Sequence, residues 1–364
     1  MLVALVVHVR VAALLSFVFL QRRFLAFVGS VAFASTASAH HSGAAYDMTR
    51  SVTIEGTVTA LLWKNPHIYM TVETKDSGGA LRFHEIEVMS VSQARGLGLR
   101  REAISPGARV VVHASPSRRG SREMAFGIAV TTSDGTEMPL SSYAGFSALP
   151  PPDAEARGLA GTWAPTVESF ARMVGANGAA PVTAAGRAAR EEVLRRYAVP
   201  SLLGDDLCEP LAPPLLHVFP DPRTIEVADT SVVIRTETNG VKQERVVHLH
   251  QKTHPPGLAP RVEGHSIGWW EGETLVIDTV AFAASSKPDL MWLPTHPGRH
   301  LVERLSLSED RRHLEYEVKL DIPEYLAKPA TWQGTWDHRP DLEPLGEPCD
   351  PEAALRFLEE VHAR

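Results

Sequence analysis

The sequence predicts a mainly β protein built from two barrels, a small OB-like five-stranded barrel and a larger antiparallel barrel. Two observations carry this prediction. Short segments in which apolar and polar residues alternate recur in both halves of the chain, as in half-buried strands. A stretch at 139–158, rich in proline, serine and alanine, separates the halves and has the composition of a linker. The predicted barrel domains therefore span 40–138 and 159–364.

The first domain contains five predicted strands and one short helix. Val52, Ile54 and Val58 alternate with polar residues, so the first strand buries one face against a core. A short helix at 90–97 follows the third strand. The predicted strands are 51–59, 67–73, 81–88, 108–114 and 125–131. This order is the layout of an OB-like barrel.

The second domain opens at 159–163 and contains one convincing helix at 183–197, which begins after Thr183 as its N-cap. The rest is rich in strands, with tight turns at 271–273 and 308–310 between neighbours. The predicted strands are 224–227, 231–237, 244–250, 264–270, 274–279, 300–308, 313–321 and 331–338. About eight consecutive antiparallel strands suggest an up-and-down barrel, which removes exposed edges by closing on itself.

The first 39 residues have the features of a cleavable export signal. A positive flank at 21–24 precedes an apolar run at 25–34, and small residues stand at 37–39. We therefore expect a mature chain that begins at His40, is periplasmic or secreted, and has no stable membrane span after cleavage. The apolar stretch at 2–20 leaves two interpretations, a later translation start or a membrane anchor. An anchor needs about 20 uninterrupted apolar residues.

Composition limits the partners and the chemistry. A net charge of -7 over 364 residues offers no basic field for nucleic acid. The sequence contains no phosphate-binding glycine loop, no Cys-x-x-Cys pair and no His-Glu-x-x-His pair. The chain therefore leans away from the common enzyme classes, although an enzyme is not excluded.

Only two cysteines are present, Cys208 and Cys349. In an oxidising compartment an even count indicates a disulfide, and the alternative is a pair of buried free thiols. A bridge would stabilise the fold by about 4–5 kcal/mol in the chain-entropy model, because it closes a very long loop.

The predicted mature terminus is a candidate metal site. The α-amino group and the imidazole of His40 form a ready chelate, and a third nitrogen from His41 or His67 would complete a set suited to copper. The alternative is that the paired histidines form a flexible polar terminus without a ligand.

The second domain carries a different set of polar side chains. Alternation places His265 on the same strand face as Trp269, and it places Glu303 on the same face as Leu301. Such residues could contact a ligand, perform acid–base chemistry, or be inward polar groups satisfied by hydrogen bonds. The candidates are His265, Asp278, His296, His300, Glu303 and Glu317.

Tryptophans also concentrate in the second domain. They could line an apolar ligand cavity, or they could be ordinary core residues at strand ends. The residues that we predict to contact a ligand are His265, Trp269, His300, Glu303 and Trp332.

The first domain resembles an uncharacterised family of exported bacterial proteins. The resemblance rests on His-His-Ser at 40–42, Thr-Ile-Glu-Gly-Thr-Val at 53–58 and Trp-Lys-Asn-Pro-His at 63–67, and it covers about 40–135. It implies no established activity.

The second domain resembles another uncharacterised exported family. The matching segments are 264–279, 300–304 and 314–318. Members usually have arginine where Trp269 stands and an aromatic Pro-Trp pair where this chain has 328–332. The resemblance implies a lipocalin-like barrel but no established activity.

Three functions remain open at this point. The leading expectation is non-catalytic binding of a small apolar molecule inside the second barrel, which rests on fold analogy. The second is periplasmic copper or other metal binding at the mature terminus. The third is an enzyme that acts on a hydrophobic substrate, with His265, His300 and Glu303 as polar groups.

Overall fold

The computed structural model describes residues 46–118, 123–141, 152–175, 180–197, 208–342 and 346–354. The predicted signal at 1–39 and residues 142–151 of the predicted linker lie outside these residues, as do His40 and His41. Among the described residues, no helix has the length and apolar character that a membrane crossing requires.

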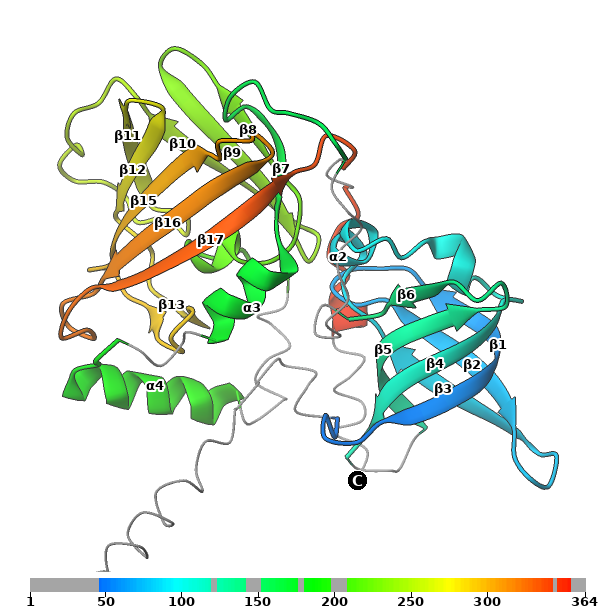
Figure 1. Cartoon of the computed structure of the whole chain (residues 1–364). Helices are drawn as coiled ribbons and strands as arrows, with labels where there is room; N and C mark the ends of the chain where they lie inside the picture. Colours follow the sequence, from blue (N-terminus) through cyan, green and yellow to red (C-terminus); the bar gives the residue numbers. More distant parts are fainter. Residues whose placement is uncertain are drawn as a thin grey trace, which may run out of the picture. The chain divides into compact units, whose positions relative to one another are not determined.

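The first domain is a closed five-stranded barrel (Figure 1). Its strands are β1 (Val52–Leu62), β2 (Tyr69–Lys75), β3 (Leu81–Glu87), β4 (Arg109–Pro116) and β5 (Met124–Thr132). They run in the order β3-β2-β1-β4-β5, and a parallel pairing of β3 with β5 closes the barrel. Helix α2 (Val91–Gly96) follows the third strand, as predicted, and Ser90 caps it by accepting a hydrogen bond from Gln93 N. A short strand β6 (Glu137–Pro139) extends the sheet beyond β5.

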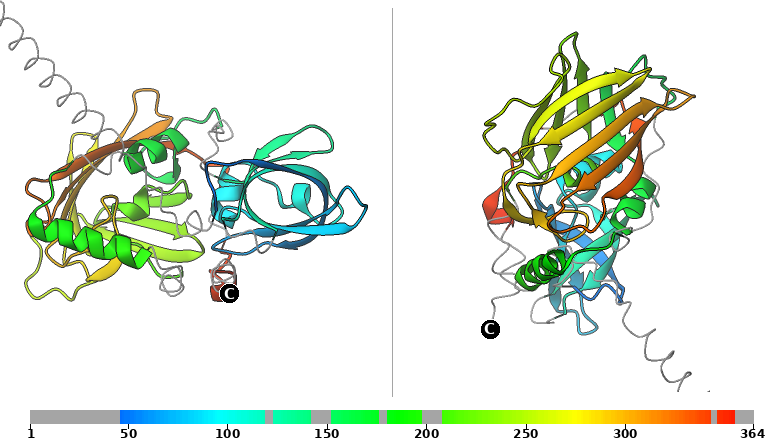
Figure 2. Two further views of the ribbon diagram at one scale, coloured as in Figure 1. Left: turned by 90° about the horizontal axis from the view of Figure 1, so that it is seen from below. Right: turned by 90° about the vertical axis from the view of Figure 1, so that its left-hand side faces the viewer.

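The second domain is a closed nine-stranded barrel (Figure 2). The order around it is β10-β11-β12-β15-β16-β17-β7-β8-β9. The strands are β7 (Gly161–Pro165), β8 (Arg223–Val227), β9 (Ser231–Thr238), β10 (Val241–His248), β11 (His265–Glu271), β12 (Thr274–Val280), β15 (His300–Leu307), β16 (His313–Asp321) and β17 (Ala330–His338). The fold class predicted from the sequence is therefore confirmed for both domains.

The second barrel differs from the prediction in two details. Strand β7 adds a ninth member, and it pairs with both β17 and β8. Strands β10 and β11 pair in parallel, not antiparallel. A parallel pair cannot be joined by a tight hairpin, so residues 249–264 form a long connection that we call the crossover loop.

Helices and a small second sheet accompany the barrel. Helix α4 (Ala184–Tyr197) begins after Thr183, whose hydroxyl accepts a hydrogen bond from Gly186 N at 3.0 Å, as the N-cap prediction requires. The other elements of the second domain are α3 (Val167–Gly175), the 3-10 helix η5 (Leu215–His217), and the hairpin of β13 (Ser285–Pro288) with β14 (Pro294–Thr295). A further 3-10 helix, η2 (Arg101–Ile104), belongs to the first domain.

The core of the second barrel includes residues from every strand of the barrel except β11, with Trp163 and Trp336 as its largest fully buried apolar side chains. Helix α3 packs against β17 at Gly334. A Cβ atom there would lie 2.5 Å from Ser169 Oγ and 2.9 Å from Met173 Sδ. Glycine at this position therefore permits the close approach of the helix.

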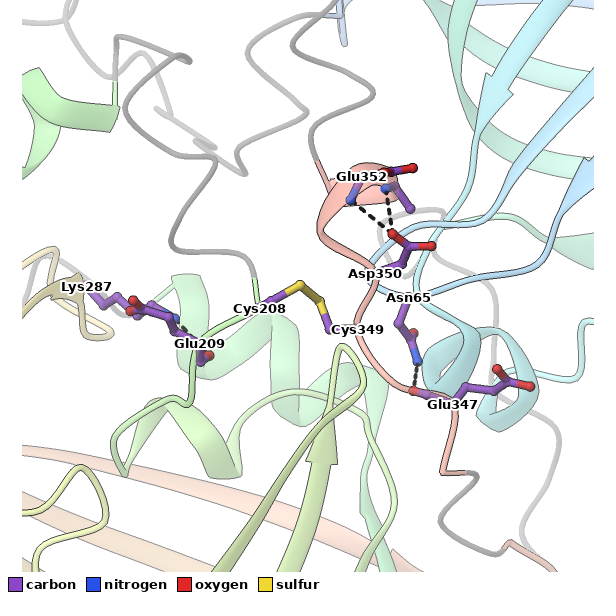
Figure 3. Close-up of a disulfide and its surroundings, with 9 residues drawn as sticks. Asn65, Cys208, Glu209, Lys287, Glu347, Cys349, Asp350 and Glu352 are labelled. Carbon is purple, nitrogen blue, oxygen red and sulfur yellow. Dashed lines mark hydrogen bonds and ion pairs between the residues drawn. A yellow bond between two sulfur atoms is a disulfide. The ribbon is translucent and has the colours of Figure 1, made fainter.

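The predicted disulfide is confirmed. Cys208 and Cys349 are bonded, with 141 residues of sequence separation, and Figure 3 shows the bridge next to Glu209. The bridge anchors the start of the segment that leads into η5.

Candidate functional site

The interior of the second barrel holds a network of buried charged side chains. Glu303 on β15 accepts hydrogen bonds from Arg245 through Oε2 and from the Tyr316 hydroxyl through Oε1, the latter at 2.8 Å. Arg245 also donates to Ser266 Oγ at 2.9 Å and to Thr279 Oγ1 at 2.6 Å. All these side chains are buried, so this layer of the barrel is filled by protein atoms that satisfy one another.

A second buried arginine lies beside this network. Arg223 stands over the Trp336 ring, with 4.4 Å between Cζ and the ring centroid, and donates to Phe219 O at 2.8 Å. His217 lies between the two arginines, with Nδ1 3.3 Å from Arg223 Nη1 and Nε2 3.1 Å from Arg245 Nη1. Both guanidinium groups can only donate hydrogen bonds. A neutral imidazole has one acceptor nitrogen and one N–H group, so His217 can accept a hydrogen bond from only one of the two arginines.

Burial and charge fix the protonation of this network. Burial, and then the charges of Arg245 and Arg223, hold the pKa of His217 well below its ordinary value, so the ring is neutral. Burial, and then the Glu303 carboxylate, hold the pKa of Tyr316 well above its ordinary value. Tyr316 therefore remains a hydrogen-bond donor to Glu303 at any physiological pH.

The outer wall of the same barrel carries a second polar group, the histidine–aspartate cluster. It consists of His248 and His250 near the end of β10, His254 in the crossover loop, His265 on β11, Asp278 on β12 and His300 on β15. The strand register brings the last three together, because β11 pairs with β12 and β12 pairs with β15.

Asp278 is the centre of the cluster. Its Oδ1 lies 2.8 Å from His254 Nε2, and its Oδ2 lies 2.8 Å from His300 Nε2. His254 Nδ1 lies 2.8 Å from His265 Nδ1. The His265 ring also stacks on His248, with 5.2 Å between centroids. The result is a hydrogen-bonded chain that runs from His300 through Asp278 and His254 to His265.

The ionised state of Asp278 determines which ring nitrogen of His254 and of His265 carries a hydrogen. Burial alone would raise the pKa of Asp278, but hydrogen bonds from His300 and His254 outweigh it, and the net pKa is lowered. An ionised carboxylate only accepts, so His254 donates from Nε2. Neutral His254 then accepts at Nδ1, and His265 donates from its Nδ1. His265 is left with Nε2 as an unprotonated nitrogen.

The histidines of the cluster respond to charge in opposite directions. The hydrogen bond to Asp278 raises the pKa of His300. Burial, and then repulsion from His254 and His248, lowers the pKa of His265. Burial, and then His250, lowers the pKa of His248. His300 therefore takes up a proton more readily than His265 or His248.

A cavity of about 150 Å³ lies at one end of the barrel. Residues before and within η5 form one wall, and the crossover loop and the β13 hairpin form the others. Its apolar lining includes Leu211, Ala212, Leu215, Val262 and Ala283. The wall that contains Leu211 follows directly after Cys208, so the disulfide fixes its start.

The charges around the cavity are paired within the protein. Arg299 Nη2 donates to Asp289 Oδ2 at 2.9 Å, and Arg299 Nη1 donates to Pro213 O at 2.8 Å. Lys287 Nζ donates to Glu209 O at 2.8 Å and lies 3.8 Å from the Glu209 carboxylate (Figure 3). Two cations and two anions line the cavity, so it has no excess charge. A neutral guest fits such a site better than an ion, because no lining charge is left without a counter-charge.

The structure separates the predicted ligand-contacting residues. His265 and His300 belong to the outer cluster, whereas Glu303 is inside the barrel wall. Trp332 is buried in the core, and Trp269 is 41% exposed on the outer face, where Nε1 donates to Glu271 Oε1 at 3.0 Å. None of these five residues lines the cavity.

Of the three predicted metal ligands, only His67 lies within the described residues. Its Nδ1 is 3.4 Å from Glu87 Oε1 and 3.2 Å from Val88 O. Glu87 is fully buried and its other oxygen accepts from the Tyr46 hydroxyl at 2.8 Å. A buried carboxylate therefore lies beside His67, a neighbour that the sequence pattern did not indicate.

Other functional candidates were also missed. His254 lies in a loop rich in proline and glycine, where no periodicity places a side chain. Arg245 shares the inward parity of Val247, and that parity was the available signal for a buried charge. In the described part of the chain, no group of three or more histidine, cysteine, aspartate or glutamate side chains is arranged to hold a metal ion.

Comparison with known proteins finds one family model that matches part of the chain, mainly in the first domain. Residues 28–126 match the model of a family of unknown function, DUF6152. No curated protein matches the chain.

Proposed function

We propose that the second barrel is a non-catalytic binding domain for a small, neutral and largely apolar molecule, held in the cavity beside η5. The observation that carries the proposal is a preformed space whose lining is about half apolar and whose charged groups already pair with one another. Ligand sites are usually concave and mostly apolar, with a few polar groups that orient the guest.

The size of the cavity limits the ligand. A cavity of about 150 Å³ is comparable with an engineered cavity that binds benzene. The guest is therefore about one six-membered ring in size. Thr295 and Ser285 offer hydroxyl groups at the lining, so a ring with one neutral hydrogen-bonding substituent, such as phenol, suits the site.

Isothermal titration calorimetry with phenol tests the proposal. A ring of this size should bind with a Kd of about 0.1–1 mM. Benzoate and benzylammonium should bind at least about ten-fold more weakly, because each carries a charge into a site whose charges are already paired.

A pair of substitutions localises the binding. Ala212→Met fills the cavity and should abolish phenol binding. Ala327→Met places the same side chain at an exposed turn outside the cavity and should leave binding unchanged. Phenol that binds both variants equally would exclude this cavity, and absence of binding to the unmodified protein at about 5 mM phenol would exclude the function.

A location outside the cytoplasm and kinship of the second barrel with the lipocalin-like exported family are parts of the same proposal. The bond between Cys208 and Cys349 supports an oxidising compartment, because disulfides persist there and are rare in the cytosol. N-terminal sequencing of protein purified from its native host tests the location, since a chain that retains residues 1–39 contradicts it.

Copper binding by His40, His41 and His67 is a second candidate function. The observation in its favour is the fully buried Glu87 carboxylate, 3.4 Å from His67, because a buried anion is stabilised by a nearby cation. Metal analysis of correctly processed protein tests it. His67→Gln should reduce copper retention at least about ten-fold, and equal retention by His84→Gln and His67→Gln would contradict a role for His67.

A further inference from the structure

The crossover loop contacts both the histidine–aspartate cluster and the cavity. In its middle, His254 bonds to Asp278 and His265. At its end, Val262 lines the cavity. One segment of 16 residues therefore connects a group of titratable side chains with the wall of the proposed ligand site.

The end of the loop is held by backbone bonds to the neighbouring strand connection. Arg261 N donates to Ala281 O at 3.0 Å, and Ala283 N donates to Arg261 O at 2.8 Å. Glu263 Oε1 accepts from Gln243 Nε2 at 3.0 Å.

Gln243 extends this connection to the opposite cavity wall. Its side-chain amide bonds to both Leu211 N and Leu211 O, at 2.8 and 2.9 Å. A displacement of the crossover loop would therefore disturb two walls of the cavity at once.

We propose that the crossover loop is a proton-operated latch, which leaves the barrel wall and releases the bound molecule when the histidines around His254 take up protons. This inference rests on the proposed function, because it concerns regulation of the same cavity.

Proton counting at the pair of facing rings gives the physical reason. With no added proton, one hydrogen lies between His254 Nδ1 and His265 Nδ1. One added proton leaves that hydrogen bond in place, whichever ring becomes charged. A second proton puts N–H groups on both facing nitrogens 2.8 Å apart, where two donors meet without an acceptor. The bond is then lost and two positive charges repel each other.

The surroundings add to the repulsion. His248 at the end of β10 stacks on His265, and His250 lies edge-on to His248. A proton on His248 therefore adds positive charge directly beside His265. On the side of β15 and β16, His300 interacts with Asp278, Asp321 and Lys319. His300 already neutralises Asp278 when it is protonated, so no further anion of the cluster remains to balance the loop histidine.

The directions of the pKa shifts of His265 and His300 define the pH range in which the loop opens. The pKa of His265 is lowered in the folded protein, so its contribution to loop closure is present above the ordinary histidine pKa of 6.5 and is lost as the pH falls below it. The pKa of His300 is raised, so its bond to Asp278 strengthens the cluster over the same acid range and is lost only as the pH rises through the raised pKa. At acid pH the crossover loop therefore opens, whereas the contact of β15 through His300 is kept.

Hydrogen exchange on the unliganded protein tests the latch itself. The amides of Arg261 and Ala283 bond the loop to the barrel, and their protection factors are corrected for the direct effect of pH on exchange. Protection should fall at least about ten-fold between about pH 7.5 and about pH 5.5, since one pKa unit corresponds to a factor of ten. The Val318 amide of β16 should not change.

Three substitutions distinguish loop opening caused by protonation of the cluster from a general loss of stability at acid pH. His254→Gln can donate to Asp278 and accept from His265 but cannot be protonated, so the fall in protection should shrink to less than about two-fold. His248→Gln removes a charge but none of the hydrogen bonds that hold the loop, so the midpoint of opening should move to lower pH. His313→Gln disrupts a similar histidine–aspartate contact, with Asp337, and should behave as the unmodified protein.

Phenol affinity at the two pH values tests the connection with the cavity. The Kd should rise at least about five-fold at acid pH in the unmodified protein and remain constant in His254→Gln. Equal affinity at both pH values, or an unchanged midpoint in His248→Gln, overturns the latch. If phenol fails to bind at either pH while the exchange results hold, the proposed function fails and the proton-dependent opening stands.

Discussion

Replacement of Glu303 by glutamine should cost a large part of the stability of the second barrel. Glu303 is 1% exposed and is the anion that compensates Arg245 inside the barrel. Its two oxygens serve two donors, Arg245 and the Tyr316 hydroxyl. Glutamine has the same shape but only one side-chain oxygen, so one of these buried donors must lose its acceptor.

The expected magnitude follows from these contacts. An unsatisfied buried donor costs about 1–3 kcal/mol. Removal of one partner of a buried ion pair costs about 3–5 kcal/mol in total, because the remaining charge is left without compensation. We expect Glu303→Gln to lower the free energy of unfolding by about 3–5 kcal/mol.

Urea denaturation followed by tryptophan fluorescence measures this loss. Every tryptophan except Trp63 belongs to the second domain, so the signal reports mainly on that barrel. Glu315→Gln changes an exposed glutamate on β16 and should shift the free energy by no more than about 0.5 kcal/mol. A loss of less than about 1 kcal/mol for Glu303→Gln would refute the reasoning, since it would mean that water or repacking compensates Arg245 at little cost.

Three further predictions concern the same fold. Cys208→Ser should lower the free energy of unfolding by up to about 5 kcal/mol in the chain-entropy model, and the difference should vanish when both proteins are unfolded in reductant. Burial raises the pKa of Asp221 from 3.8 to about 6. Its protonated form therefore favours folding, and that contribution is lost as the pH rises through about 6. The stability of Asp221→Asn relative to the unmodified protein should be greater at pH 7.5 than at pH 5 by about 1–1.5 kcal/mol in urea titrations, and a pH-independent difference would contradict the assignment. Gly334→Ala should destabilise the barrel by about 1–3 kcal/mol, because the added methyl group meets Ser169 and Met173, and an unchanged thermal midpoint would show that α3 moves freely.

Much of the fold could be predicted because strand periodicity depends on local sequence. Alternation placed Glu303 on the same face as Leu301, and both are buried inside the barrel. For His265 alternation gave only the shared face with Trp269 and left open whether that face points inward. Strand β7 was harder to predict because it is only five residues long, too short for a clear period. The parallel β10–β11 pairing depends on where two distant segments meet, which alternation does not encode.

The candidate sites were less predictable than the strands that carry them. His265 and His300 were candidate ligand-contacting residues in the sequence, but their link through His254 depends on the path of an irregular loop. The cavity lining includes Ala212 and Ala283, small residues that have no chemical signature in a sequence. They line a cavity only because η5 and the β13 hairpin come together beside the barrel.

The pairing of β7 with β17 has a consequence for synthesis of the chain. Trp336 is paired with Pro165, so the first strand of the barrel finds one of its two neighbours only after nearly the whole polypeptide has emerged from the ribosome. Until then β7 and β16 present unpaired edges, and such edges invite association between nascent chains. A C-terminal truncation before residue 330 should therefore yield aggregated material and not a smaller soluble barrel.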